Sequence, residues 1–236
     1  VVLMLAFVLI LGTAAAQPAN PCDPAYVVRT GKSIRVSPTD VDDTANIQCA
    51  FDWANARGPG MTVRLTPGTF HTAQIYIYDF VGSFRGSGVD KTVIVNLPNL
   101  YVRLDEPFYG LPSADNPQPF LVNFVRGDFQ VSHLAFRIEG QSPTQGWSYW
   151  GAPPFYELIA AIVILGDEAH ARISHVWVEG EPSDTSIFDY NLFNGIYPEG
   201  HLPEGYASET IAPIAGTFEI THSTFKRVGS GTPFLG

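Results

Sequence analysis

Aromatic side chains gather in one stretch of the chain, residues 140–157. Trp147, Tyr149, Trp150 and Tyr156 lie there within ten positions, with Phe155 beside them. Flat rings at the edge of a groove stack on the faces of sugars, and the same rings can instead pack down to cover a core. The four residues are therefore candidate substrate-binding residues for a carbohydrate, and covering of the core is the alternative.

A second stretch, residues 180–210, is rich in carboxylates. Two such groups could act as acid and base in glycoside hydrolysis, or several could hold calcium. The acidic residues lack the spacing of a calcium loop, so a solvated acidic loop explains them as well. No cofactor is evident, calcium remains open, and no catalytic residue is assigned. The carboxylates are Asp184, Asp189, Glu199, Glu204 and Glu209.

Three histidines are further candidates for a chemical role. His133, His175 and His222 each follow Ser or Thr, in the phrases DFQVSHLAF, ARISHVWVEG and FEITHSTF. Three imidazoles would suit zinc. If each phrase belongs to a successive winding, however, neighbouring rings stand ~4.8 Å apart, and the first and third are too distant to share one ion. We expect a structural ladder at a turn and no metal.

The same phrases define the architecture, because they recur at intervals of about 45 residues, which is the scale of a solenoid repeat. Apolar runs at 119–125, 157–165 and 211–216 precede them, and we assign these runs as the first strand of each winding. The stretches 140–157 and 180–210 are then loops that leave the stack after the third strand.

One helix is expected before the solenoid, at about 43–57. Asp42 or Asp43 can cap its start, and Ile47, Phe51 and Ala54 fall on one face. The sequence Gly-Pro-Gly at 58–60 ends it. Short β-rich runs separated by turn residues follow.

The run D-D-T-A-N-I-Q-C-A-F-D-W-A, then V-R-L-T-P-G-T-F, then F-R-G-S-G-V-D-K-T-V-I resembles the opening of the pectate-lyase-like superfamily. The resemblance covers about 40–95, and the repeated phrase extends it to about 228. It implies an all-β fold: a right-handed parallel β-helix with an N-terminal capping α-helix. It also implies a polysaccharide ligand on the face made by the first strands. The superfamily includes lyases, hydrolases, epimerases and adhesins, so the fold does not give the activity.

The chain departs from the calcium-dependent lyases of that superfamily, which place several carboxylates on the first-strand face. Residues 161–165 offer none, and the preceding winding offers only Asn123. We therefore keep two functions open. One is a lyase or glycoside hydrolase acting on an extracellular polysaccharide, of undetermined reaction type; the other is a non-catalytic polysaccharide-binding or adhesin-type solenoid.

The N-terminus predicts export. Residues 1–16 are apolar and end in small residues, as in a secretory signal peptide, and an uncleaved membrane anchor is the alternative. A lead-in segment, 17–39, and the β-helix domain, 40–236, would follow, with further C-terminal coils expected beyond Gly236. The mature protein would be secreted, extracellular or periplasmic, without a membrane segment. Cys22 and Cys49 could pair in such a compartment, or remain two unrelated apolar residues.

The charge distribution constrains the partners. Formal net charge is −10, which does not fit the basic footprint of a nucleic-acid binder. Residues 138–236 hold three basic groups against twelve acidic ones, so an anionic ligand would be repelled there unless a cation bridged it. The oligomeric state is not encoded in any pattern we recognise.

Overall fold

The computed structural model describes residues 22–98, 102–103, 113–115, 120–140, 155–156, 160–182, 194–199 and 216–228. These residues are mostly in strands, which confirms the all-β prediction. In chain order the elements are β1 (Val27–Thr30), β2 (Ser33–Val36), α1 (Thr44–Arg57), β3 (Met61–Leu65), β4 (Gly68–Thr72), β5 (Ile75–Arg85), β6 (Thr92–Asn96), β7 (Val102–Arg103), β8 (Phe120–Arg137), β9 (Phe155–Tyr156), β10 (Ala160–Glu179), β11 (Asn194–Glu199), β12 (Thr217–Thr221) and β13 (Thr224–Lys226).

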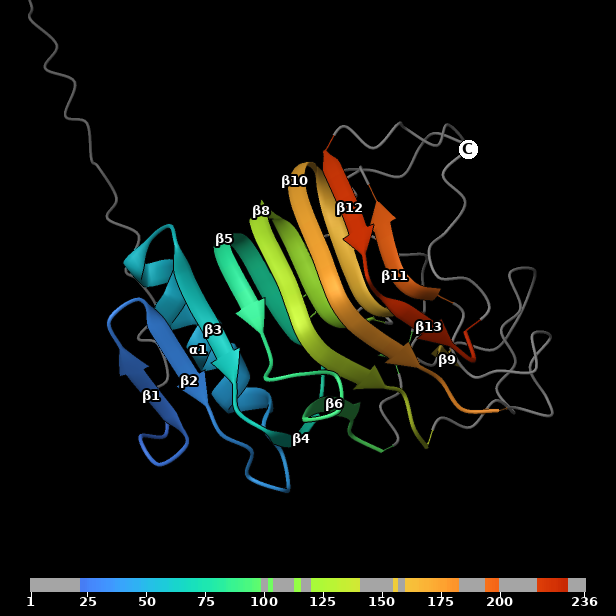
Figure 1. Cartoon of the computed structure of the whole chain (residues 1–236), viewed down its shortest axis with the longest axis horizontal. Helices are drawn as coiled ribbons and strands as arrows, with labels where there is room; N and C mark the ends of the chain where they lie inside the picture. The colour runs from blue at the N-terminus through green and yellow to red at the C-terminus, as the bar shows by residue number, and fades with distance from the viewer. Residues whose placement is uncertain are drawn as a thin grey trace, which may run out of the picture.

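Three parallel ladders run through these strands (Figure 1). The first-strand ladder joins the beginnings of β5, β8 and β10 to β11. The second-strand ladder joins β2, β3, the end of β5 and the middle of β8 and β10 to β12. The third-strand ladder joins β4, β6 and the ends of β8 and β10 to β13. Equivalent residues of successive windings are therefore neighbours.

Alternation along each strand separates the core from the outer face. In the second-strand ladder, Ile34, Val63, Phe84, Val131 and Ile173 occupy equivalent interior positions, and each is at most 1% exposed. Large β-branched and aromatic side chains suit this arrangement because each fills the space between the ladders and rests on its counterpart in the next winding.

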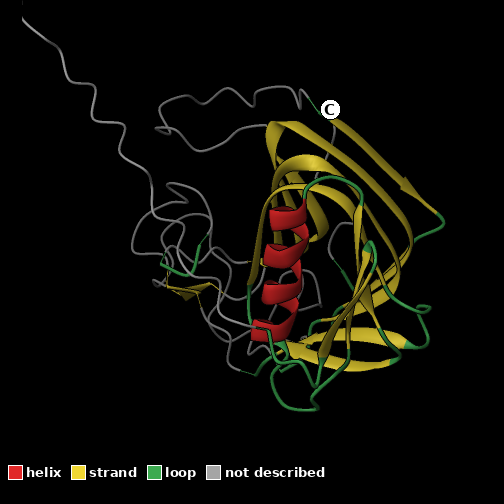
Figure 2. Ribbon diagram, turned by 90° about the vertical axis from the view of Figure 1, so that its left-hand side faces the viewer, coloured by secondary structure: helices red, strands yellow, loops and turns green. Residues whose placement is uncertain are grey.

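The helix α1 lies across the N-terminal end of the stack (Figure 2). Phe51 is fully buried and its ring meets those of Phe80, Phe84 and Phe124 edge-on, at centroid distances of 5.2, 5.1 and 6.0 Å. Burying such a side chain contributes about 1.5–3 kcal/mol. The helix thus closes the core at the end where no earlier winding covers it.

Polar side chains of α1 also take the place of a neighbouring strand. The Gln48 amide donates to the Tyr76 carbonyl at 2.7 Å and accepts from the Tyr76 N–H at 2.9 Å. Asn55 donates to the Tyr78 carbonyl at 2.8 Å. These bonds satisfy backbone groups at the edge of the first-strand ladder, which would otherwise be an open template for another chain.

The two residues expected to cap the helix, Asp42 and Asp43, make different hydrogen bonds. Asp42 accepts a hydrogen bond from the Thr44 N–H at 2.9 Å. The Asp43 carboxylate instead accepts from the backbone N–H groups of Thr39 and His71, at 2.7 and 3.0 Å. Asp43 occupies the N-cap position, but its fully buried carboxylate joins the helix start to β4 and makes no capping hydrogen bond.

Two kinds of corner bend the long strands. Between the first and second ladders, Asp79 and Arg126 have positive φ, and Gly127 follows with φ 108°. A Cβ on Gly127 would collide with the Phe80 carbonyl oxygen. Between the second and third ladders, the corner residues are His133, His175 and His222, with φ of 58°, 54° and 50°. β5, β8 and β10 are therefore continuous strands that bend, whereas β12 and β13 are separate strands on either side of His222.

One strand assignment was wrong. The strand beside Ala160–Leu165 in the first-strand ladder is β11, Asn194–Glu199, and not the run 211–216. β11 lies inside the stretch 180–210, so that stretch is not a loop throughout. The sequence favoured 211–216 because IAPIAG is more apolar than NGIYPE, the sequence of β11.

Two further pairings extend the expected organisation. β1 and β2 lie in the segment expected as a lead-in, and β2 pairs with β3, so the sheet begins before residue 40. β9, at the end of the aromatic stretch, pairs antiparallel with β7. The segment between β6 and β8, to which no element was assigned from the sequence, thereby contributes a strand.

Candidate functional site

The outer side of the first-strand ladder divides into an apolar part and a polar part. On β8 and β10, Val125, Val163 and Leu165 are at most 4% exposed and form their own small cluster. No carboxylate stands in the first-strand segments of these two strands (120–125 and 160–165), as the sequence predicted. The polar part lies on β5 and on the neighbouring helix.

Two tyrosines mark this polar part. Ile75 and Ile77 are buried in the core, so Tyr76 and Tyr78 point outward, and both are half-buried. Gln74, 9% exposed, accepts a hydrogen bond from the Tyr76 hydroxyl at 2.9 Å. Burial, and then the nearby Tyr78, raise the pKa of Tyr76. Its hydroxyl therefore stays neutral and remains a hydrogen-bond donor.

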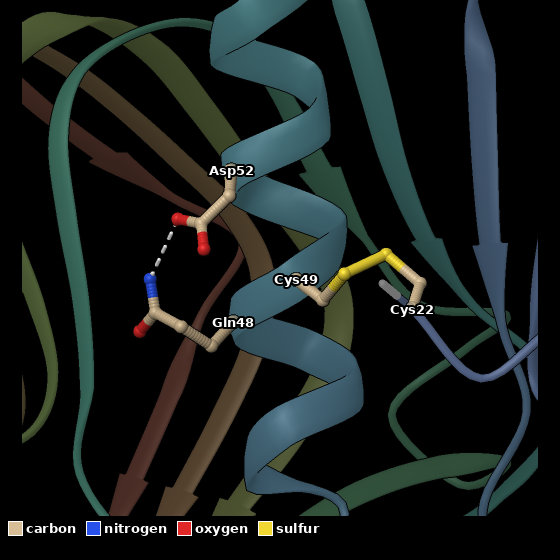
Figure 3. The surroundings of a disulfide bond; sticks show 4 residues. All are labelled: Cys22, Gln48, Cys49 and Asp52. Carbon is tan, nitrogen blue, oxygen red and sulfur yellow. Dashed lines mark hydrogen bonds between the residues drawn. A yellow bond between two sulfur atoms is a disulfide. The ribbon is translucent and has the colours of Figure 1, made fainter. Parts of the chain in front are cut away.

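The helix supplies the remaining groups. Gln48, already bound to the Tyr76 backbone, also donates to the Asp52 carboxylate at 3.1 Å (Figure 3). Burial raises the pKa of Asp52, and the hydrogen bond from Gln48 opposes the rise. Because the residue as a whole is exposed, solvent limits this effect. We call Gln48, Asp52, Gln74, Tyr76 and Tyr78 the tyrosine face.

A second carboxyl follows Tyr78 directly. Asp79 binds Arg126 of the next winding through two hydrogen bonds, of 2.7 and 2.9 Å. The hydrogen bond from Arg126 lowers the pKa of Asp79. Asp52 and Asp79 thus border the same strand segment with their pKa values shifted in opposite directions, which is a feature of acid and base pairs in enzymes. The lowered pKa keeps Asp79 ionised at neutral pH.

Asn123 adds a buried polar group to the neighbouring winding. It is fully buried, and its amide donates to the carbonyls of Ile75 and Phe120 at 3.1 and 3.2 Å. Its Oδ1 has no hydrogen-bond partner. The side chain thus joins β8 to β5 and keeps one unused acceptor next to Tyr76, its register partner.

The three histidines stack as predicted. The ring centroids of His133 and His175 lie 4.8 Å apart, and those of His175 and His222 lie 4.9 Å apart, with interplanar angles of 10° and 7°. Parallel rings cannot direct their nitrogens at one ion, which agrees with the structural ladder. Among the residues described, no three His, Cys, Asp or Glu side chains are grouped to hold a metal.

The aromatic residues proposed from the sequence cannot be placed in this site. Trp147, Tyr149 and Trp150 lie outside the described residues, and Tyr156 is described only by the backbone pairing of β9 with Val102. The acidic residues Asp184, Asp189, Glu204 and Glu209 also lie outside. Only Glu199 falls in a described strand, β11, where its backbone pairs with Leu165.

Sequence reasoning missed the tyrosine face although the signal was present. The run Ile75-Tyr76-Ile77-Tyr78 alternates apolar and amphipathic residues, so a period of two places both rings on the outer face. Asp52 was hidden because its role depends on the packing of α1 against β5. No described helix is long and apolar enough to cross a membrane.

Cys22 and Cys49, left open by the sequence, form a disulfide with a Cα–Cα distance of 5.5 Å (Figure 3). The bridge joins the segment before β1 to the middle of α1. Because the same helix carries Gln48 and Asp52 on its other side, the bridge restrains the element that positions them.

Comparison with known proteins gives little further information. No family model matches the chain, and no curated protein matches it. One solved structure that resembles it is a pectin methylesterase variant in complex with a hexasaccharide, with 13% identity and a TM-score of 0.36. The match covers 72% of this chain. The chain spans 58% of the length of that protein.

Proposed function

We propose that the chain is a right-handed parallel β-helix of the pectate-lyase-like group and that it handles an extracellular polysaccharide on the tyrosine face. Three parallel ladders around one core and the motifs shared with that superfamily support the fold. The observation that carries the function is the pair of outward rings, Tyr76 and Tyr78, beside the hydrogen-bonding groups Gln48, Asp52 and Gln74. Rings with polar neighbours offer a sugar both stacking and hydrogen bonds.

The chain could act as an enzyme or as a binding protein, and the role of Asp52 distinguishes these two functions. A carboxyl with a raised pKa can donate and accept a proton, so Asp52 is the candidate acid or base of a lyase or hydrolase. The lack of carboxylates in the first-strand segments of β8 and β10 (120–125 and 160–165) favours the alternative, a non-catalytic binding solenoid. In an enzyme, Asp52 would be required for cleavage of the polymer. In a binding protein, Asp52 would contribute only to affinity.

Segments beyond the tyrosine face extend this proposal. Trp147, Tyr149, Trp150 and Tyr156 would continue the sugar-binding surface, and calcium would be a possible cofactor of the acidic stretch 180–210. Residues 1–16 would direct export and be cleaved. The Cys22–Cys49 bridge supports an oxidising compartment, which suits a secreted, extracellular or periplasmic protein.

The test uses the full chain and a panel of polysaccharides, with and without calcium. Affinity electrophoresis measures retention, and ultraviolet absorbance and reducing-end assays measure unsaturated and hydrolysed products. Replacing Tyr76 and Tyr78 together by alanine should lower affinity by roughly tenfold to a hundredfold, since each stacked ring contributes about 0.5–1.5 kcal/mol. Val41→Ala is the matched control, because Val41 is 74% exposed elsewhere on the molecule.

Asp52→Asn then distinguishes the two modes. Loss of product release with affinity retained within a fewfold would identify the enzyme. If wild type releases no product from any polymer but binds one, the chain is a binding protein. Failure to bind or cleave any polysaccharide in the panel, with a normal melting temperature, contradicts the proposal.

A further inference from the structure

The second-strand ladder carries a column of arginines on its outer face. Arg35 of β2 is the register partner of Arg64 of β3, which is the partner of Arg85 of β5. All three are exposed, and the buried residues Ile34, Val63 and Phe84 beside them point the other way. Figure 1 shows β2, β3 and β5 side by side at the N-terminal end of the stack.

A column of hydroxyl groups runs next to the arginines. Ser33, Thr62 and Ser83 are register partners in the same three strands. Each precedes an arginine by two positions, so hydroxyl and guanidinium lie on the same face of a strand. We call these six residues the arginine face: Ser33, Arg35, Thr62, Arg64, Ser83 and Arg85.

Four other basic groups on or beside the ladders form ion pairs with carboxylates. Arg126 pairs with Asp79, Arg172 with Asp128 at 3.1 Å, and both Lys226 and Arg227 with Glu179 at 3.1 and 3.3 Å. Within the part of the chain that the structure describes, no carboxylate pairs with Arg35, Arg64 or Arg85. Later windings replace them with Ser132, Ser174 and Thr221.

Three unpaired like charges, one strand spacing of ~4.8 Å apart, repel one another. In a chain with a net charge of −10, such a column is not a by-product of a basic composition. An anionic ligand with one negative group per winding would offset the repulsion between the three arginines. A guanidinium binds a carboxylate or sulfate through two parallel hydrogen bonds.

We propose that the arginine face is a second binding surface, for a linear acidic polysaccharide that runs along the stack with one anionic group per winding. One sugar unit of an extended chain covers a distance similar to one winding, and the hydroxyl column meets the sugar hydroxyls. The anionic group is a carboxylate or a sulfate. The choice of a polysaccharide among polyanions rests on the proposed function, whereas the surface itself is separate from the tyrosine face.

A nucleic acid fits this surface less well. Its phosphates need a broad basic footprint, whereas the arginine face is a single column of three guanidinium groups. A short, regular row of anionic groups fits a column three arginines long.

The test measures affinity of the full chain at low salt for four probes: alginate, alginate esterified on its carboxyl groups, dextran sulfate and uncharged dextran. Single-stranded DNA is a fifth probe. We expect alginate or dextran sulfate to bind at least tenfold more tightly than its uncharged counterpart. The variant R35Q/R64Q/R85Q should lose roughly tenfold in affinity for the acidic polymer, since exposed ion pairs are individually weak, and its salt dependence should become shallower.

Matched variants separate contact from net charge. R57Q/K91Q/R137Q removes three exposed basic residues outside the arginine face and should change affinity less than twofold. R35K/R64K/R85K keeps the charge but not the paired donors, so its affinity should lie between wild type and the glutamine variant. Melting temperatures of all three variants check the fold.

Equal losses in both glutamine variants would show a long-range charge effect and overturn the inference. Tighter binding of single-stranded DNA than of either acidic polysaccharide would also overturn it, in favour of a nucleic acid. Binding of uncharged dextran with no preference for dextran sulfate or alginate would overturn the arginine face and leave the proposed function standing. Loss of affinity in R35Q/R64Q/R85Q, but not in Y76A/Y78A, would support the arginine face and contradict the tyrosine face.

Discussion

Two outer faces of the same windings have opposite chemistry. The tyrosine face on the first-strand ladder is aromatic and half-buried, and its nearest charged pair, Asp79 and Arg126, is internally neutralised. The arginine face on the second-strand ladder is exposed and has no paired carboxylate among the described residues. Both are built on β5, and one corner at Asp79 separates them. A stacked fold can therefore present two ligand surfaces from one strand, because each side of a winding has its own column of outward residues.

The largest effect is expected from a change that breaks both faces. Phe51→Ala removes the ring that closes the core against Phe80, Phe84 and Phe124, and should destabilise the protein by about 3–5 kcal/mol. Chemical denaturation measures the change, and ligand binding at both faces should weaken together. An unfolding free energy within about 1 kcal/mol of wild type would show that α1 does not close the stack.

A change in the helix edge should affect one face more than the other. Gln48→Ala removes two hydrogen bonds to the Tyr76 backbone and leaves those groups unpaired, at a cost of about 1–3 kcal/mol. Affinity at the tyrosine face should fall, whereas the arginine face should retain its acidic ligand. Ala56→Ser, an exposed position on the same helix, is the control. Equal losses at both faces would show that the faces are coupled through overall stability.

The corner between the second-strand and third-strand ladders is formed by histidines. Its backbone conformation can be tested by replacing His175 with side chains that tolerate a positive φ to different degrees. His175 has φ 54°, a conformation that asparagine tolerates and a β-branched residue does not. His175→Val should therefore destabilise the protein by about 2 kcal/mol, and His175→Asn by clearly less. Thermal unfolding of the pair gives the comparison. Similar values for both variants would indicate that ring stacking, and not backbone conformation, is the main contribution of the ladder.

The smallest effect is a pH dependence at the same corner. Burial, then the neighbouring His175 and Arg85, lower the pKa of His133 below its usual 6.5. The unfolded chain then binds a proton more readily than the folded one, so stability is fully present above pH 6.5 and declines as pH falls below it. His133→Asn should flatten this part of the stability profile. An unchanged profile would mean that other groups dominate the acid side.

Much of the fold could be predicted from the sequence because the repeat is periodic. Ile47, Phe51 and Ala54 gave the helix, and the Ser/Thr-His phrase gave the register of three windings, since both signals are local. The first strand of the third winding was misplaced because the run at 211–216 is more apolar than 194–199, which contains Asn194, Pro198 and Glu199. Only the pairing with β10 identifies 194–199 as the strand.

The candidate surfaces were harder to predict for a physical reason. Arg35, Arg64 and Arg85 are irregularly spaced in the sequence, because the segments between windings differ in length, and their column appears only when the strands pair. Tyr76 and Tyr78 follow a period-two pattern that places them on the outer face. The stretch around Trp147 contains more aromatic residues and was therefore chosen as the candidate sugar-binding segment. Asp52 looks like an ordinary helix residue until α1 is packed against β5.

The central claim is that a polysaccharide lies on the outward rings of β5, and hydroxyl-radical footprinting tests it most directly. Tyr76 and Tyr78 should be labelled in the free protein and protected when the full chain is saturated with the polysaccharide that it binds. Tyr26, half-buried elsewhere on the chain, is the internal reference and should be unchanged. Undiminished labelling of Tyr76 and Tyr78 in the saturated complex would contradict the account.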